Sequence, residues 1–286
     1  MCISDRGTGA VALAGIIAAM RITGGALEDQ KLLFLGAGEA GIGIADVFVA
    51  ALRKEGMSED EARKRCWFVD SRGLLCEGRD NIAEHKAPYA HKHEYIDNLL
   101  DTVKTLKPTV LLGLSGQPQT FTKEVVEAMS EINERPVIFA LSNPTSMAEC
   151  TAEQAYTWSG GRAVFASGSP FDPVKFGNQT FVPGQGNNAY IFPGVGLGII
   201  VSQSHVVTDE MFLAAAFSLA GQVKDSDLER GRVYPPLADI RLVSAKIAAE
   251  VAKMAYESGF TSREQPEDIL ADVKNYMYRP VYPHYV

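Results

Sequence analysis

The sequence is short of cysteine, of net positive charge and of long hydrophobic runs, and each shortage argues against a class of protein. Its 286 residues hold four cysteines and no Cys-x-x-Cys pair, so reduced thiols are favoured over a disulfide framework. The formal net charge of −8 argues against non-specific nucleic-acid binding, which needs a basic surface. Hydrophobic residues make up 46% and charged residues 22%, the balance of a globular protein with a substantial core.

An apolar run occupies residues 9–20, near the N-terminus. Its 12 residues are too few to cross a bilayer, and Asp5 stands where a secretory signal would carry basic residues. We therefore expect a buried helix that ends near Arg21, rather than a signal peptide or a membrane anchor.

A strand, a glycine-rich turn and a helix follow one another in residues 31–48, which read KLLFLGAGEAGIGIADVF. Gly36 permits a tight turn out of the strand, Gly38 lets phosphates approach the backbone, and Gly41 lets the helix pack closely. The helix N-terminus adds free N–H groups, which attract an anion. A lone Gly-x-Gly-x-x-Gly is a weak signal, but its place between a strand and a helix predicts a pyrophosphate site.

A second strand is predicted at residues 66–69, and it ends in Asp70. The charged residues 53–65 before it are typical of a solvated helix face or a surface loop. In dinucleotide-binding folds, an acidic residue at the end of the second strand accepts hydrogen bonds from the adenosine ribose. Asp70 is therefore the candidate for that contact.

Short apolar runs further along the chain predict more strands, with helical patterns between them. This alternation predicts an α/β fold, Rossmann-like and doubly wound, with a mostly parallel sheet. Ligands of such sheets bind at the carboxyl ends of the strands, so the polar segments 115–117 and 142–145 are expected at the rim of the site. The predicted strands are 109–114, 136–141 and 163–166, and the predicted helices are 121–129 and 152–158.

From about residue 206 onward the patterns are helical, with no further strand signal. We divide the chain into a dinucleotide-binding domain, residues 1–205, and a helical C-terminal segment, residues 206–286. The aromatic and proline-rich residues 276–286 predict an irregular tail laid on a surface. The C-terminal helices are expected at residues 211–223, 240–258 and 267–277.

Six segments together resemble one family, the malic enzymes. They occur in the order of the family, and the resemblance covers nearly the whole chain from Gly7. The segments LSNPT and PGQGNNAYIFPG are far more specific than the glycine-rich turn. The matching segments are residues 7–24, 34–45, 68–74, 140–156, 165–174 and 183–198.

The resemblance implies an enzyme that oxidises malate with NAD or NADP and a divalent metal, magnesium or manganese, and releases pyruvate and carbon dioxide. The metal would act as a Lewis acid in the decarboxylation. In this family the matching region is the dinucleotide-binding domain and the C-terminal region. Malate and pyruvate are the implied partners and the complete enzyme a homo-oligomer, with no nucleic-acid or membrane partner.

By position, the resemblance assigns the site to the glycine-rich turn, to the end of the second strand and to two amides. Asn143 and Asn187, the substrate-binding candidates, resemble the asparagines that contact the substrate carboxylate and the nicotinamide region. A neutral amide both donates and accepts hydrogen bonds, which suits an anion and a cationic ring. The plainer alternatives are a turn cap at Asn143 and an ordinary helix N-terminus at Asn187. The cofactor-binding candidates are Gly36, Gly38, Glu39, Ala40, Gly41, Asp70, Ser71, Arg72, Asn143 and Asn187.

The choice between NAD and NADP depends on the residues after the second strand. Asp70 alone favours NAD, because its charge repels a 2′-phosphate. Ser71 and Arg72 follow directly, and an arginine pairs well with a phosphate. Lys86 is a further candidate cation. The balance favours NADP.

The chain departs from the family pattern at the residues that would hold the metal. Where the family has a ligand aspartate in a segment like FNDDIQGT, this chain has Ser4, and Asp5 stands one position away. The other acidic ligands, the catalytic lysine and the catalytic tyrosine of the family lie in a region that this chain does not contain. We therefore assign no catalytic residue, keep Asp5 as the candidate metal ligand, and expect this chain alone to lack activity, because such residues act as a unit.

Two interpretations of the function remain open. The chain supplies the dinucleotide-binding part of a decarboxylating malate dehydrogenase, or it is a non-catalytic dinucleotide-binding module or truncated fragment. Release of carbon dioxide from malate separates them. The expected location is cytoplasmic, with a plastid or mitochondrion as the alternative if a transit peptide lies upstream.

Overall fold

Seven strands form one mostly parallel sheet in the computed structural model, which describes residues 3–278. The strand order is β3-β2-β1-β4-β5-β6-β9; β3 pairs antiparallel with β2, and the other neighbours pair parallel. Because β1 lies between β2 and β4, the chain builds outward on one side of β1 and then on the other. The strands are β1 Leu32–Leu35, β2 Cys66–Asp70, β3 Gly73–Leu74, β4 Val110–Gly113, β5 Val137–Ala140, β6 Val164–Ser167 and β9 Gly184–Gln185.

Side chains along the strands alternate between the two faces of the sheet, as a period of two requires. In β1, Phe34 belongs to one buried cluster and Leu33 belongs to the cluster on the opposite face. In β5, Phe139 lies with Phe34, and Ile138 lies with Leu33. Both faces are covered, which is why the strands appear in the sequence as continuous apolar runs.

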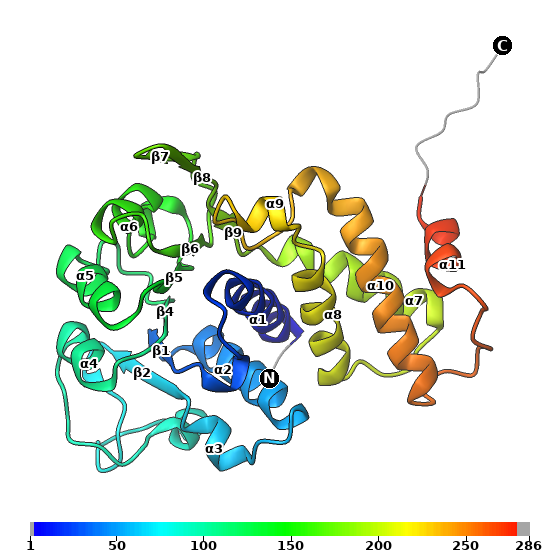
Figure 1. Ribbon diagram of the computed structural model, residues 1–286. Helices are drawn as coiled ribbons and strands as arrows, with labels where there is room; N and C mark the ends of the chain where they lie inside the picture. The colour runs from blue at the N-terminus through cyan, green and yellow to red at the C-terminus, as the bar shows by residue number, and fades with distance from the viewer. Residues whose placement is uncertain (1–2, 279–286) are drawn as a thin grey trace.

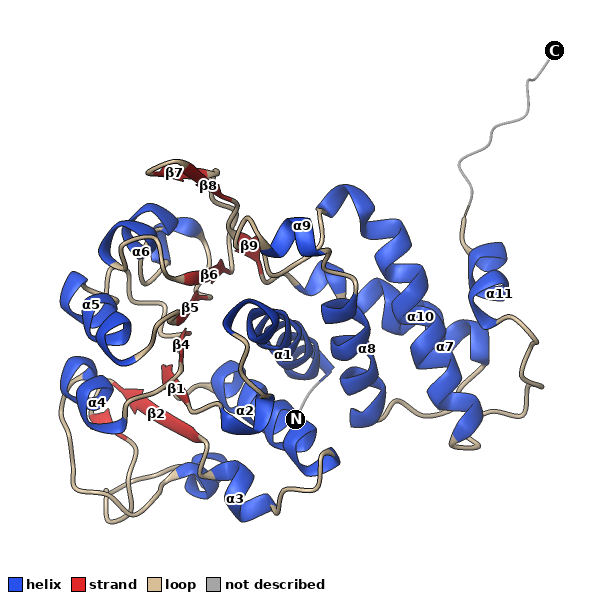
Figure 2. Ribbon diagram, viewed as in Figure 1, coloured by secondary structure: helices blue, strands red, loops and turns tan. Residues whose placement is uncertain are grey.

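Helices cover both faces of this sheet (Figure 2). The helices α4, α5 and α6 lie on one face and α1 and α2 on the other. The alternating connection between strands and helices produces the doubly wound arrangement that the sequence predicts. The helices of this part are α1 Ile3–Thr23, α2 Glu39–Lys54, α3 Glu59–Arg63, α4 Leu99–Leu106, α5 Lys123–Ile132 and α6 Ala152–Trp158.

The helix α1 lies between the sheet layer and the C-terminal helices (Figure 1), where it packs against α2 and α8. It is apolar on nearly all sides, as a helix covered all round must be. Near its end, Arg21 donates to the carbonyl oxygens of Ala220 and Val223 and pairs with Asp225 at 2.7 Å.

The C-terminal helices are α7 Phe192–Ser202, α8 Asp209–Gly221, α9 Asp225–Leu228, α10 Ile240–Glu257 and α11 Ile269–Tyr276. Short 3-10 helices are η1 Leu27–Asp29, η2 Glu84–Tyr89, η3 Thr145–Met147, η4 Asn188–Tyr190 and η5 Leu237–Asp239.

The structure confirms the predicted fold class, the predicted strands and the buried N-terminal helix, which ends at Thr23. The sequence analysis missed the antiparallel hairpin of β7 (Val174–Phe176) and β8 (Gln179–Phe181), although a two-residue Gly-Asn turn separates them. It also missed α4. The predicted tail overlaps the end of α11, and its residues 279–286 lie outside the described residues.

The division of the chain at residue 205 stays a prediction. Among residues 3–278, no helix combines the length and the apolar character that crossing a bilayer would require.

Candidate functional site

The loops after β1 and β4 meet where the order of the sheet reverses, which is the usual place for a ligand in such folds. Gly36 has a φ of 111°, and a Cβ on it would lie 2.6 Å from the carbonyl oxygen of Leu114. A Cβ on Gly41 would lie 2.6 Å from the carbonyl oxygen of Gly36. A Cβ on Gly38, in contrast, would meet no atom of residues 3–278 within 4 Å. Gly36 and Gly41 therefore serve the packing of the turn, while Gly38 borders open space.

The helix α2 begins at this open space, with Gly38 as its N-cap and Glu39 as its first residue. The first N–H groups of a helix have no acceptor within the helix, and the helix dipole adds partial positive charge there. The N–H groups of Glu39, Ala40 and Gly41 thus form the arrangement that a phosphate needs.

A cavity of 310 Å³ lies at the carboxyl ends of the strands, next to the start of α2. Ala40, Asn143 and Asn187 all line it, so the two predicted amides face the same space beside the glycine-rich turn. Leu114 and Leu141 contribute apolar wall from the ends of β4 and β5. The structure therefore brings together the parts that the sequence places far apart.

The two amides are held by local contacts. Asn143 Oδ1 accepts a hydrogen bond from Ser169 Oγ at 2.7 Å, which fixes the direction of the amide. Asn187 Oδ1 accepts from the backbone N–H of Ala189 at 2.8 Å, so Asn187 also caps the short helix η4. The plainer interpretation of Asn187 as a helix N-terminus is thus correct and compatible with its place in the cavity. Asn188 Nδ2 lies 3.2 Å from Thr8 Oγ1 of α1.

Behind the cavity wall, the side chain of Glu149 is fully buried. Its Oε1 accepts from Ser115 N and Oγ at 3.2 and 3.3 Å and from Ser142 Oγ at 2.5 Å. Its Oε2 accepts from Ser142 N at 3.4 Å. One carboxylate thereby joins the loop after β4 to the loop after β5.

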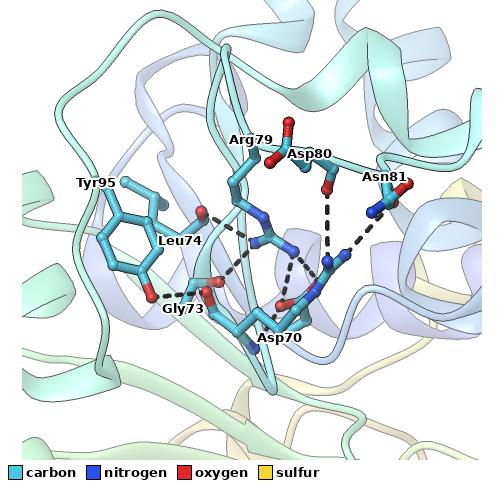
Figure 3. Close-up of polar contacts among 8 residues, drawn as sticks. Asp70, Gly73, Leu74, Arg79, Asp80, Asn81 and Tyr95 are labelled. Carbon is cyan, nitrogen blue, oxygen red and sulfur yellow. Dashed lines mark hydrogen bonds and ion pairs between the residues drawn. The ribbon is translucent and has the colours of Figure 1, made fainter.

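At the other end of the site, Asp70 lies in a network of polar contacts (Figure 3). Arg79 Nη2 lies 3.0 Å from Asp70 Oδ1 and 2.8 Å from Oδ2, and the backbone N–H of Arg72 donates to Oδ1 at 2.8 Å. Burial raises the pKa of Asp70, but the hydrogen bonds from Arg79 and Arg72 and the charge of Arg79 lower it below its ordinary value of 3.8. Asp70 is therefore a carboxylate whose charge is largely compensated inside the protein.

Two more cations stand near this carboxylate. The guanidinium of Arg72 donates to the carbonyl oxygens of Asp80 and Asn81 at 3.4 and 3.3 Å. The charge of Lys86 also lowers the pKa of Asp70. Ser71 and Arg72 are exposed.

Comparison with known proteins identifies the family. The sequence model described as malic enzyme, NAD binding domain, matches residues 6–256. The chain belongs to the malic enzyme family. It is 54% identical over 283 residues to the NADP-dependent malic enzyme of Vitis vinifera and 55% identical to the chloroplastic NADP-dependent malic enzyme of Flaveria pringlei. These matches cover 98% of this chain but 48% and 44% of the relatives, so the chain spans about half of their length.

Solved malic enzyme structures share the fold. The crystal structure of the Entamoeba histolytica malic enzyme superposes with a TM-score of 0.75 at 22% identity, covering 94% of this chain and 53% of that chain. The malic enzyme from Pyrococcus horikoshii superposes with a TM-score of 0.69 at 24% identity, covering 94% and 58%. At this level of identity, the likeness supports the fold and nothing further.

The metal that the resemblance implies has no complete set of ligands among the described residues. Among residues 3–278, no group of three or more His, Cys, Asp or Glu side chains is placed to hold a metal ion. Asp5 lies in the first turn of α1, with its Cβ 3.1 Å from the place of a Cβ on Gly43. Its role as a ligand stays a prediction.

Sequence reasoning missed Arg79 and Glu149. Arg79 follows Asp70 by nine positions, and the turn into β3 brings the two together. The sequence of residues 71–79 gives no sign that the side chain of Arg79 contacts Asp70. Glu149 sits in a short connection without periodicity, where a charged residue predicts exposure rather than complete burial. The roles predicted from the sequence for the candidate residues stay predictions.

Proposed function

We propose that this chain binds a nicotinamide dinucleotide and forms the nucleotide-binding part of an enzyme that converts malate to pyruvate and carbon dioxide. The observation that carries the proposal is the cavity shared by Ala40, Asn143 and Asn187. It joins a helix N-terminus suited to a pyrophosphate with two neutral amides suited to the reacting groups.

The direction of the bound dinucleotide follows from the order of the strands. A pyrophosphate at the start of α2 sits above β1, with β2 on one side and β4 and β5 on the other. Asp70 at the end of β2 suits the adenosine ribose, so the nicotinamide half extends toward Asn143. The residues present fit the cofactor, because Gly38 leaves its backbone open and no side chain of the described residues approaches that position within 4 Å.

NADP is the proposed cofactor. Arg79 compensates the charge of Asp70, which removes the main objection to a 2′-phosphate. Arg72, whose guanidinium lies at the carbonyl oxygens of Asp80 and Asn81, and Lys86, whose charge acts on Asp70, are then the proposed cations for that phosphate. The names of the relatives, NADP-dependent malic enzyme, support the same choice.

The bound nicotinamide would supply a hydride acceptor. The chain's own part is to orient that ring and the substrate, with Asn143 and Asn187 donating to anionic or carbonyl oxygens and accepting from N–H or O–H groups. Leu114 and Leu141 exclude water from one wall of the cavity. Because the described residues offer no complete set of metal ligands, no metal-dependent step is assigned to them.

Binding of NADPH to the 286-residue chain, followed by fluorescence and calorimetry, tests the proposal. We expect Asn143→Ala to weaken binding by about tenfold, the loss of one or two hydrogen bonds. Asn178→Ala, in the exposed turn between β7 and β8, is the matched control and should change binding less than about twofold. A wild-type chain that binds neither NADP⁺ nor NADPH would refute the proposal.

Turnover separates the enzyme from a non-catalytic module. With malate, NADP⁺ and Mn²⁺, we expect this chain alone to form no NADPH, since its described residues hold no metal site. Formation of NADPH at a rate typical of enzymes, together with carbon dioxide, would contradict this expectation. The homo-oligomeric state of the complete enzyme and the absence of nucleic-acid partners stay predictions.

A cytoplasmic location also stays a prediction. A plastid is the alternative that the names of several relatives support, since they are called chloroplastic. Imaging of the full-length gene product fused to a fluorescent protein would distinguish the two compartments.

A further inference from the structure

We propose that Glu149 is a positioning residue that fixes both loops behind the nicotinamide end of the site and makes the cavity favour the oxidised, cationic ring. The proposal rests on the proposed function, which places the nicotinamide in that cavity. It adds a residue and a redox preference that the glycine-rich turn and the two amides do not explain.

The first observation is the place of the carboxylate. Glu149 is fully buried and packs directly on the carboxyl end of β4, where a Cβ on Gly113 would lie 2.4 Å from Glu149 Cδ. A residue larger than glycine at position 113 would displace it. The fold thus reserves space for this side chain at the edge of the sheet where the cavity opens.

The second observation is the direction of the hydrogen bonds. Ser142 Oγ accepts from the N–H of Gly116 at 2.9 Å and donates to Glu149 Oε1. Ser115 Oγ accepts from the N–H of Gln117 at 3.1 Å and likewise donates to Glu149. With the two backbone N–H groups, four donors converge on one carboxyl group. An ionised carboxylate, which only accepts, satisfies this pattern.

The third observation is the absence of a balancing cation. Within the part of the chain that the structure describes, none of the ion pairs includes Glu149. Hydrogen bonds compensate a buried charge only in part. A cation that enters the neighbouring cavity would therefore gain from this carboxylate, and the oxidised nicotinamide ring is such a cation.

The connection to the cavity is short. Ser115 and Ser142, which hold the carboxylate, directly follow Leu114 and Leu141 of the cavity wall. Asn143 comes next after Ser142. The contacts that hold Glu149 therefore also hold the backbone next to Asn143, and the carboxylate lies in a poorly screened interior beside residues that adjoin the cavity wall.

Dissociation constants for NADP⁺ and NADPH, measured separately by calorimetry on the 286-residue chain, test the proposal. We expect the wild type to bind NADP⁺ more tightly than NADPH. Glu149→Gln keeps the shape but removes the charge, and it should shift the ratio of the two constants by about tenfold toward NADPH. Glu153→Gln, the same change at an exposed site of α6, should leave the ratio within about twofold.

Each outcome decides the question. A merely structural role would weaken both forms by the same factor and leave the ratio unchanged, which would overturn the redox preference. Tighter binding of NADPH than of NADP⁺ by the wild type would overturn it even if Glu149→Gln fails to fold. A wild type that binds neither form would instead refute the proposed function, so the two failures are distinguishable.

Discussion

Arg79 Nη2 lies within hydrogen-bond distance of both carboxylate oxygens of Asp70, and the Nη1 atom of the same guanidinium contacts the carbonyl oxygens of Gly73 and Leu74, both at 3.1 Å. The exposed fractions of the two side chains are 9% for Arg79 and 17% for Asp70. The turn from β2 into β3 is thus closed around an ion pair. The residue expected to contact the adenosine ribose is part of that structural pair.

Arg79→Met should therefore affect both stability and cofactor choice. It leaves a largely buried carboxylate without its partner, and we expect a loss of about 2 kcal/mol in the free energy of unfolding. The uncompensated charge of Asp70 should also repel a 2′-phosphate and move the binding preference from NADP toward NAD. Urea denaturation and calorimetric titration measure the two effects.

Arg53→Met is the control for this substitution. The Arg53 side chain is 56% exposed in its pair with Glu59, so the loss should be within about 0.5 kcal/mol. An Arg79→Met protein as stable as the wild type would contradict the predicted loss of stability. An unchanged cofactor preference would contradict the predicted shift from NADP toward NAD.

The Asp70 network also predicts a pH dependence. The folded protein holds the pKa of Asp70 below its ordinary value of 3.8, so the stabilisation is fully present above the pKa of the unfolded chain. It is lost as the pH falls through the lower pKa of the folded state. The difference in unfolding free energy between the wild type and Asp70→Asn should therefore be largest near neutral pH and shrink below about pH 4.

Denaturant titrations from pH 3 to pH 7 would measure this difference. Asp172→Asn, at an exposed position, serves as the control and should show little dependence on pH. A difference for Asp70→Asn that grows as the pH falls would contradict the prediction.

The three glycines of the turn should respond differently to alanine. Gly41→Ala places a methyl group 2.6 Å from a carbonyl oxygen and should cost about 2 kcal/mol of stability. Gly38→Ala meets open space and should cost less than about 1 kcal/mol, as an N-cap change does. It should still weaken binding of NADP⁺ by at least about tenfold, because the methyl group occupies the approach to the phosphates.

Thermal unfolding together with NADP⁺ titration would separate the two roles. Equal effects of Gly38→Ala and Gly41→Ala on stability and on binding would contradict the separate roles of Gly41 in packing and of Gly38 in binding.

Gly168 should be essential for the position of Asn143. A Cβ there would lie 2.3 Å from the carbonyl oxygen of Leu141 and within 2.9 Å of both amide atoms of Asn143. Gly168→Ala is expected to cost about 2 kcal/mol and to weaken nucleotide binding. Gly221→Ala, at the end of α8 with nothing within 4 Å, should leave both properties nearly unchanged. Differential scanning fluorimetry and titration provide the comparison, and a fully stable, fully binding Gly168→Ala protein would refute it.

The pattern of residues alone was sufficient for the fold class and for the strand, turn and helix of residues 31–48. Strands buried on both faces appear as apolar runs, and the turn at residues 36–41 is local in the chain, so its chemistry is visible in a short segment. Family resemblance, rather than periodicity, pointed to Asn143 and Asn187. The longer helices and strands were predicted from their apolar patterns. The short strands β3 and β9 and the β7–β8 hairpin were not predicted.

The tertiary structure decided which groups meet. The sequence separates Asp70 from Arg79, and Gly113 and Ser115 from Glu149, and no periodic pattern records that these groups converge. Whether a carboxylate is exposed, paired with an arginine or buried among donors depends on the packing of distant segments. Local residue preferences therefore specify the strands, the helices and the turn, while the environment of each charge is set only by the assembled sheet and its two layers of helices.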